Sequence, residues 1–257
     1  ITIIVFMILA SINFNLYAIT MKRKWRTVLH NQECRVFLGI LLGASLIIAA
    51  DLYLNESTHY AIGKSLRSGT FQVASIMTTT GYGTIDYGAW PPVSKWLLVL
   101  LMFIGGCAGS TAGGLKVIRV IVFLRVGLQE VERTFRPNVV RPLRVNRYAL
   151  DPATQRTVSG YVGFVLFIFI LSPIVLLVLQ NELPLAGQIE LDLDSAFSAV
   201  AATLNNIGPG LRKVGPAENY AFFNSPAKLF LCFLMILGRL EVMVLLSLFL
   251  PGFWRRH

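Results

Sequence analysis

The hydrophobic positions of this chain fall into five long runs that carry almost no charge. A helix that crosses the roughly 30 Å hydrocarbon core of a bilayer needs about 20 mostly apolar residues. The pattern therefore predicts an all-α integral membrane protein with about five spans. The runs are Ile1–Met21, Val36–Leu54, Trp96–Leu115, Thr157–Asn181 and Leu229–Leu250.

The amino-acid composition agrees with a membrane location. Of the 257 residues, 55% are hydrophobic and 14% are charged, against about 25% charged in a typical soluble domain. This excludes an ordinary cytosolic enzyme. Cys34, Cys107 and Cys232 are odd in number and far apart, so they indicate neither a disulfide framework nor a metal cluster. Because the chain starts at Ile1 inside an apolar run, we expect a fragment of a longer protein and no signal peptide.

The net charge of +10 reflects an uneven distribution of basic residues between the connections. Lysine and arginine gather at 22–35, at 116–147 and at the C-terminus, whereas 182–194 is acidic and 51–56 is poor in base. By the positive-inside rule, the basic connections and the C-terminus are predicted to be cytoplasmic and the others to face outward. No nucleic-acid partner is needed to explain the charge, and the long basic loop has anionic membrane lipid or a protein as a further possible partner.

Two shorter, more polar segments follow the outward-facing connections, and each ends in a glycine-containing turn. When Gly81 is aligned with Gly208, and six residues are inserted downstream, Met102–Gly105 falls on Met235–Gly238. The sequence therefore predicts a repeated unit of helix, re-entrant pore loop and helix, as in a potassium channel. The segments are Ser65–Met77 with the turn Thr78–Gly83, and Ser195–Leu204 with the turn Asn205–Gly210.

Each turn has the features of a cation-selectivity filter. Non-helical backbone at membrane depth occurs only where it is buried in protein or lines a water-filled cavity, and its carbonyls can replace the hydration shell of potassium. The run from Thr79 to Gly83 follows the Thr-Val-Gly-Tyr-Gly filter pattern with Thr80 in the valine place. One such turn is more typical of an ordinary loop, but its repetition favours a filter. The predicted potassium-binding residues are Thr79, Thr80, Gly81, Tyr82, Asn206, Ile207 and Gly208.

Several motifs resemble the superfamily of potassium transporters that includes Trk, Ktr and plant HKT proteins. The resemblance covers nearly the whole chain, and the Asn-Asn-Ile-Gly-Pro-Gly turn is more similar to Trk membrane subunits than to Ktr or HKT proteins. It implies a pore of four linked repeats, of which this chain would be the C-terminal half. The motifs are Phe103–Arg119, Ala202–Gly210, Gly238–Val242 and Phe253–Arg255.

The resemblance also implies a division of the chain and a set of partners. Residues 1–34 would be the last helix of the preceding repeat with a cytoplasmic loop, 35–126 a pore repeat, 127–153 a basic cytoplasmic loop and 154–257 the final pore repeat. Family members lie in the bacterial inner membrane, form homodimers and are regulated by a cytosolic nucleotide-binding ring, TrkA. These partners are implied by the resemblance alone.

The glycine-rich run Gly105–Gly114 is predicted to break its helix. It is not a phosphate-binding loop, because no Gly-Lys-Ser/Thr follows. Close helix packing through small-xxx-small spacing is the alternative, but each glycine costs a helix about 1 kcal/mol relative to alanine. In the family this position is an intramembrane gate below the filter. The resemblance assigns that role to Gly105, Gly106, Gly109, Gly113 and Gly114.

Arg239 is the second expected gate element. An arginine at the centre of a membrane helix costs about 2.5 to 3.5 kcal/mol on insertion scales, so it should face the protein interior or water. The repeat alignment places Arg239 opposite Gly106, at the level of the glycine-rich run. A structural salt bridge to a distant carboxylate is the alternative. The resemblance favours a positive charge that limits cation flow.

These features predict uptake of potassium through a carbonyl-lined filter, with potassium as the permeant ligand and without catalytic residues. Because Ile207 and Pro209 replace a second Thr-Val-Gly-Tyr copy, discrimination against sodium or rubidium is expected to be modest. Two alternatives stay open. A membrane enzyme would need paired histidines or carboxylates, or clustered cysteines, inside the spans, where the sequence has none. A non-conducting scaffold subunit would tolerate loss of Gly81.

Overall fold

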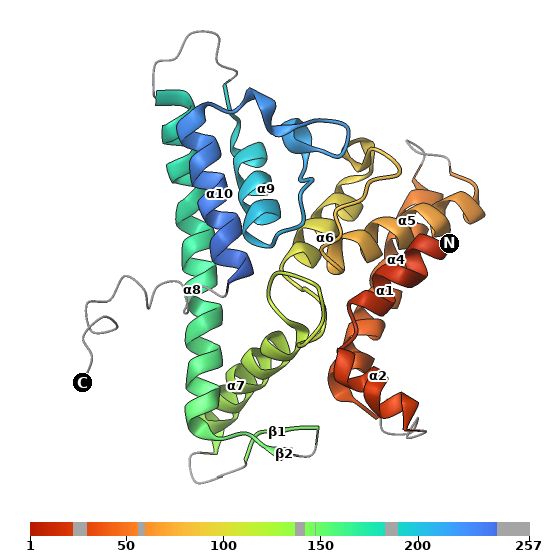
Figure 1. Ribbon diagram of the computed structural model, residues 1–257, viewed down its shortest axis with the longest axis vertical. Coiled ribbons are helices and arrows are strands. Elements are labelled where there is room, and N and C mark those ends of the chain that lie inside the picture. Colours follow the sequence, from red (N-terminus) through yellow and green to blue (C-terminus); the bar gives the residue numbers. More distant parts are fainter. Residues whose placement is uncertain (23–29, 56–59, 137–141, 147, 183–189, 241–257) are drawn as a thin grey trace.

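The computed structural model describes residues 1–22, 30–55, 60–136, 142–146, 148–182 and 190–240 (Figure 1). Four sequence-based expectations fall outside these residues. They are the second half of the run Leu229–Leu250, which includes the end of the Gly238–Val242 motif, the Phe253–Arg255 motif, the cytoplasmic C-terminus and several basic residues of the connections.

Helices make up most of the described chain, so the predicted helical class is confirmed. The α-helices are α1 (Thr2–Ala10), α2 (Phe14–Met21), α4 (Gln32–Leu54), α5 (Ile62–Met77), α6 (Pro92–Met102), α7 (Val117–Phe135), α8 (Pro152–Leu177), α9 (Leu193–Leu204) and α10 (Ser225–Arg239). The shorter elements are η1 (Tyr87–Ala89), η2 (Val178–Glu182), η3 (Arg212–Val214), η4 (Tyr220–Phe222) and the antiparallel pair β1 (Arg144–Val145) and β2 (Tyr148–Ala149).

Two of the described helices are long and apolar enough to cross a membrane. They are α4, with 23 residues, and α8 continued by η2, with 31 residues. At about 1.5 Å per residue, α4 extends about 35 Å. On α8, the side chains of Phe167, Ile170 and Ile174 are each more than half exposed. Contiguous exposed apolar surface of this kind is typical of a face that contacts lipid or another protein.

The run Ile1–Met21 is not the single helix that was predicted. It forms α1 and α2, which meet at an angle of 97°. The side chain of Asn13 caps α2 by accepting a hydrogen bond from the Asn15 amide (2.8 Å). An asparagine side chain that bonds its local backbone in this way competes with helix continuation. Counted as one broken span, the pair is a third candidate to cross a membrane.

The run Trp96–Leu115 does not form one span, because α6 ends at Met102 and α7 starts only at Val117. The segment 127–153, expected to be a basic loop, begins inside α7. α7 then continues to Phe135. The apolar residues of α7 recur at helical spacing among charged ones. This amphipathic pattern favours a surface helix, even though the segment is rich in charged residues.

The helices pack as two groups around separate hydrophobic cores. In Figure 1, α9 lies beside α8 and α10, while α5 packs against α4 and α6. The order helix, shorter helix with its turn, helix thus occurs twice. Ile207, which follows α9, packs into the first core, and Leu115, which precedes α7, packs into the second. The first core includes Phe37, Ile48 and Leu98, and the second includes Leu176, Ala199 and Leu234.

Gly238 sets how closely α10 approaches the end of α9. A Cβ atom at this position would lie 1.8 Å from the carbonyl oxygen of Leu204. The obstacle is backbone, which cannot move aside as a flexible side chain can. Any larger residue must therefore push α10 away from α9.

We expect Gly238→Ala to lower the free energy of unfolding by at least about 2 kcal/mol, because overpacking forces a backbone shift. The matched control is Gly39→Ala on α4, where an added Cβ meets nothing within 4 Å. Since alanine favours helix by about 1 kcal/mol over glycine, this control should be neutral or slightly stabilising. Thermal unfolding in detergent compares the two. Equal losses in both variants would contradict the close approach.

Candidate functional site

The chain leaves α5 through a turn with two left-handed residues. Thr79 and Gly81 have φ angles of 53° and 75°. A left-handed residue other than glycine is rare and costs on the order of 1–3 kcal/mol, so surrounding contacts must hold Thr79 in place. Besides a bond from the Gly81 amide to the Ser75 carbonyl (3.3 Å), three backbone hydrogen bonds tie the turn to the helix end. They run from the amides of Thr78, Thr79 and Thr80 to the carbonyls of Ala74 (2.9 Å), Ile76 (3.0 Å) and Ser75 (2.9 Å).

The turn after α9 has the same backbone geometry at the aligned positions. Asn206 and Gly208, which align with Thr79 and Gly81, have φ angles of 57° and 112°. The same three hydrogen bonds recur, although the sequences differ. They run from the amides of Asn205, Asn206 and Ile207 to the carbonyls of Ala201 (3.2 Å), Thr203 (3.0 Å) and Ala202 (2.8 Å).

The two turns touch each other. A Cβ atom on Gly81 would lie only 2.0 Å from the carbonyl oxygen of Ile207, so no other residue fits there without displacing the second turn. Both turns line one cavity of about 380 Å³, whose wall includes Gly81, Gly83, Ile207, Gly208 and Tyr220. The structure thus brings together the two segments that contain the seven predicted filter residues.

Most carbonyls of the turns have no protein donor. Among the described residues, no hydrogen bond is made to the carbonyl oxygens of Thr79, Thr80, Gly81, Asn206 and Ile207. The carbonyls of the other two predicted filter residues accept hydrogen bonds. Ser75 Oγ donates to the Tyr82 carbonyl (2.7 Å), and the Tyr220 hydroxyl donates to the Gly208 carbonyl (2.8 Å). Five carbonyl oxygens are therefore available to coordinate a cation.

The glycine-rich run is a closed loop between α6 and α7, as its predicted break implied. Its ends are joined where the Gly105 amide donates to the Leu115 carbonyl (2.7 Å) and the Val117 amide donates to the Gly106 carbonyl (3.2 Å). A Cβ on Gly105 would lie 2.3 Å from the Gly113 carbonyl oxygen. Gly109 and Gly114 have φ angles of 70° and 65°. Glycine is therefore needed both for close approach and for backbone angle.

The glycine-rich loop contacts both the first turn and Arg239. The Gly113 amide donates to Thr79 Oγ1 (2.7 Å), and Arg239 Nη1 donates to the Thr111 carbonyl (3.2 Å). Arg239 thus contacts the loop at Thr111, whereas the repeat alignment placed it opposite Gly106. Among the described residues it forms no ion pair. The loop and α10 enclose a cavity of about 220 Å³ lined by Gly113, Gly114, Lys116, Arg119, Arg239 and neighbouring residues.

Comparison with known proteins identifies the family. Residues 1–252 match the TrkH family, described as cation transport protein. The chain belongs to the TrkH family. It is 36% identical over 254 residues to the Trk system potassium uptake protein TrkH of Salmonella typhimurium, covering 98% of this chain and 50% of the relative. It is 37% identical to the protein of that name from Vibrio parahaemolyticus, with the same shares covered.

A solved structure agrees with this assignment. The crystal structure of the potassium transporter TrkH from Vibrio parahaemolyticus matches with a TM-score of 0.85 and 34% identity, covering 98% of this chain and 52% of that one. This TrkH-family chain therefore spans about half the length of the curated relatives it matches. Family and apolar helices together indicate a membrane protein.

Sequence reasoning missed three residues that hold this TrkH-type site. Ser75 and Tyr220 fix the carbonyls at the edges of the two turns. Glu33 was assigned to a connection, but it lies in the first turn of α4, is 5% exposed and accepts a hydrogen bond from the Ala108 amide (2.7 Å). A lone acid at the start of an apolar run was an available signal for Glu33. The Tyr220 contact is made across a loop and has no local signature.

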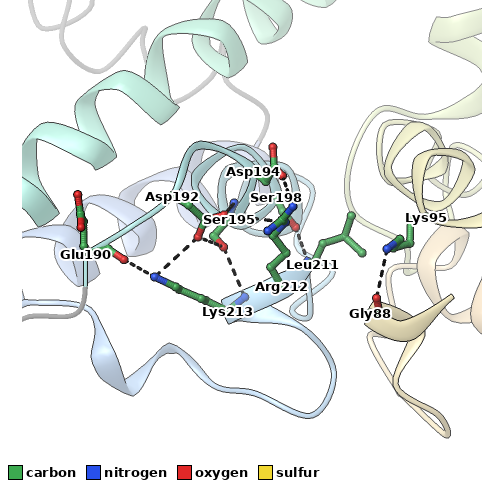
Figure 2. Close-up of polar contacts among 10 residues, drawn as sticks. All are labelled: Gly88, Lys95, Glu190, Asp192, Asp194, Ser195, Ser198, Leu211, Arg212 and Lys213. Atoms are coloured by element: carbon green, nitrogen blue, oxygen red, sulfur yellow. Dashed lines mark hydrogen bonds and ion pairs between the residues drawn. The ribbon is translucent and has the colours of Figure 1, made fainter. Parts of the chain in front are cut away.

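A polar cluster ties the segment after the second turn to the start of α9 (Figure 2). Asp192 caps α9 by accepting hydrogen bonds from the Ser195 hydroxyl (2.7 Å) and amide (3.3 Å). Arg212 pairs with Asp194 (2.8 Å), and Lys213 donates to the Glu190 carbonyl. The segment that follows the second turn is thus anchored to the start of α9 by charged and polar groups.

Burial alone would raise the pKa of the Asp192 carboxyl, but the hydrogen bonds from Ser195 and the positive charge of Lys213 outweigh it and lower the pKa. A carboxyl whose pKa is lower in the folded protein stabilises it above its unfolded pKa. That stability is lost as the pH falls through the folded pKa.

Asp192→Ala is therefore expected to lower the free energy of unfolding by about 1 kcal/mol at neutral pH, as loss of a helix cap does. Asp194→Ala, which removes only an exposed ion pair, should cost about 0.5 kcal/mol or less. The deficit of Asp192→Ala should shrink below about pH 4, the ordinary range of an aspartate pKa. Thermal unfolding at several pH values measures it. A deficit independent of pH would contradict the lowered pKa.

Proposed function

We propose that this chain forms half of a potassium-selective pore in a bacterial uptake system. The observation that carries the proposal is the matched pair of turns after α5 and α9, which have unpaired carbonyl oxygens and approach each other closely where Gly81 faces the Ile207 carbonyl. The names of the relatives, Trk system potassium uptake proteins, supply the ion.

In this proposal, dehydrated potassium binds to backbone carbonyls. Those of Thr79, Thr80, Gly81, Asn206 and Ile207 are free of protein donors among the described residues. Tyr82 and Gly208 are secondary ligands, because their carbonyls already accept hydroxyl donors. Two turns cannot surround an ion, so two further repeats must complete the ring. The doubled length of the relatives leaves room for them.

The loop formed by Gly105–Gly114 and the Arg239 side chain act as the gate. The loop is bonded directly to Thr79, and Arg239 is bonded to the loop. A guanidinium beside the ion path repels cations electrostatically, and displacement of the loop would carry this charge away with it. Gating then requires only that a flexible glycine-rich segment moves.

The remaining expectations concern the membrane and the partners. α4 and α8 cross a bacterial inner membrane in contact with lipid, and the basic segments around α7 and the C-terminus face the cytoplasm. The proposed assembly is a homodimer whose basic cytoplasmic surface docks a nucleotide-binding regulator of the TrkA type. The phrase "Trk system" in the relatives' names agrees with more than one component.

A non-conducting scaffold and a membrane enzyme are the alternative functions. The matching geometry of the two turns has no use in a scaffold, which would accept a side chain at Gly81. An enzyme would need clustered catalytic or metal-binding side chains, and the described residues contain no group of three or more histidine, cysteine or acidic side chains able to hold a metal. Both alternatives are weaker than a transporter of the matched family.

Gly81→Ala should abolish selective potassium uptake, since the added Cβ collides with the Ile207 carbonyl and the left-handed backbone disfavours alanine. Uptake of potassium or rubidium by transport-deficient cells expressing the protein that carries this chain is the measurement. Gly63→Ala, where an added Cβ meets nothing within 4 Å, is the matched control. Normal selective uptake by the Gly81→Ala variant would contradict the filter proposal.

Arg239→Ala should raise basal potassium flux severalfold, because it removes the positive charge and the bond to the Thr111 carbonyl. Flux of rubidium into reconstituted vesicles measures the effect. Lys228→Ala, at the opposite end of α10, removes a charge away from the loop and should leave flux unchanged. Equal flux through the Arg239 and Lys228 variants would count against the gate.

A further inference from the structure

The glycine-rich loop is docked on the corner between α1 and α2. Because the helix bends there by 97°, the carbonyls of Ala10 and Ser11 have no helical donors ahead of them. The loop supplies the donors: the Cys107 amide bonds to the Ser11 carbonyl (2.9 Å), and the Thr111 amide (3.3 Å) and hydroxyl (3.0 Å) bond to the Ala10 carbonyl. In return, the Phe14 amide donates to the Gly109 carbonyl (3.1 Å).

Glu33 holds the same loop from α4. Its carboxylate is 5% exposed and accepts the Ala108 amide at 2.7 Å. Lys116, which follows the loop, contributes positive charge nearby. One buried acid on α4 therefore engages a backbone amide in the middle of the glycine-rich segment. Hydrogen bonds to a charged acceptor are roughly twice as strong as neutral ones.

We propose that Glu33 is a positioning residue that latches the glycine-rich loop onto the α1–α2 corner and so holds it beneath the first turn. The effect of the Glu33 latch on flux rests on the proposed gate function of the loop. The contacts that make up the latch do not depend on that function. Loss of the latch frees residues 107–111 from their docking surface. The loop then loses the fixed position from which Gly113 contacts Thr79.

Cys107 provides a readout of docking that is independent of flux. Its side chain is fully buried, whereas Cys34 is buried in α4 and Cys232 is exposed on α10. In a Cys34→Ser, Cys232→Ser background, the rate of modification by N-ethylmaleimide therefore reports exposure of the loop. Reaction of a buried thiol requires local opening, and its rate follows the population of the open form.

In membranes containing the protein that carries this chain, Glu33→Ala should speed modification of Cys107 about tenfold, as expected for losing a charge-assisted hydrogen bond. Glu33→Gln keeps an acceptor oxygen and should speed it only a few fold. Thr111→Val, which removes the hydroxyl bond to Ala10, should give a similar small increase. The matched control is Arg35→Ala, an exposed residue in the same helix turn, which should react as the parent does.

Rubidium flux is measured on the same variants to separate the two proposals. Faster Cys107 modification with raised basal flux supports both the latch and the gate. Faster modification with unchanged flux supports the latch and overturns the gate. Unchanged modification in Glu33→Ala overturns the latch. If that variant does not accumulate in the membrane, the Glu33→Gln and Thr111→Val rates decide, and parent-like rates in both overturn it.

Discussion

Backbone amides and carbonyls that leave a helix inside apolar surroundings must find partners within the protein, because lipid offers none. The arrangement of this chain depends on that constraint. The turns after α5 and α9 satisfy their amides by bonding back to the helix that precedes each of them, and they leave carbonyls unpaired. The glycine-rich loop bonds several of its groups to the α1–α2 corner, Glu33 and Thr79. These amides are bonded within the protein, whereas five carbonyl oxygens of the two turns accept no hydrogen bond among the described residues.

Close approach of backbone to backbone makes this possible, and it explains where glycine is required. At Gly81, Gly105 and Gly238 an added Cβ would lie within 2.3 Å of a backbone carbonyl oxygen. At Gly39 and Gly63 nothing lies within 4 Å. Glycine is therefore required by close approach at the first three positions, which lie in the first turn, the glycine-rich loop and α10, whereas Gly39 and Gly63 have room for a side chain.

The helices and the glycine-containing turns after α5 and α9 could be predicted because their signals are local: hydrophobic runs, short polar helices and glycine turns are all read along the chain. The break between α6 and α7 was predictable for the same reason, since five glycines in ten residues disfavour a helix. The predictions of helix boundaries failed where a side-chain cap or the spacing of apolar residues outweighed the overall composition of a segment. Asn13 divides one apolar run into two helices, and the amphipathic spacing in α7 overrides the high charge of a segment expected to be a loop.

The sequence by itself determined the membrane class, the family and the residues of both turns, because hydrophobicity and glycine placement act through the local backbone. The tertiary structure alone decided which carbonyls stay free, that Arg239 meets the loop at Thr111, and that Glu33 is buried against Ala108. These contacts join residues separated by 75 positions or more in the chain. Distances of that kind are set by packing of whole helices, which no local pattern records.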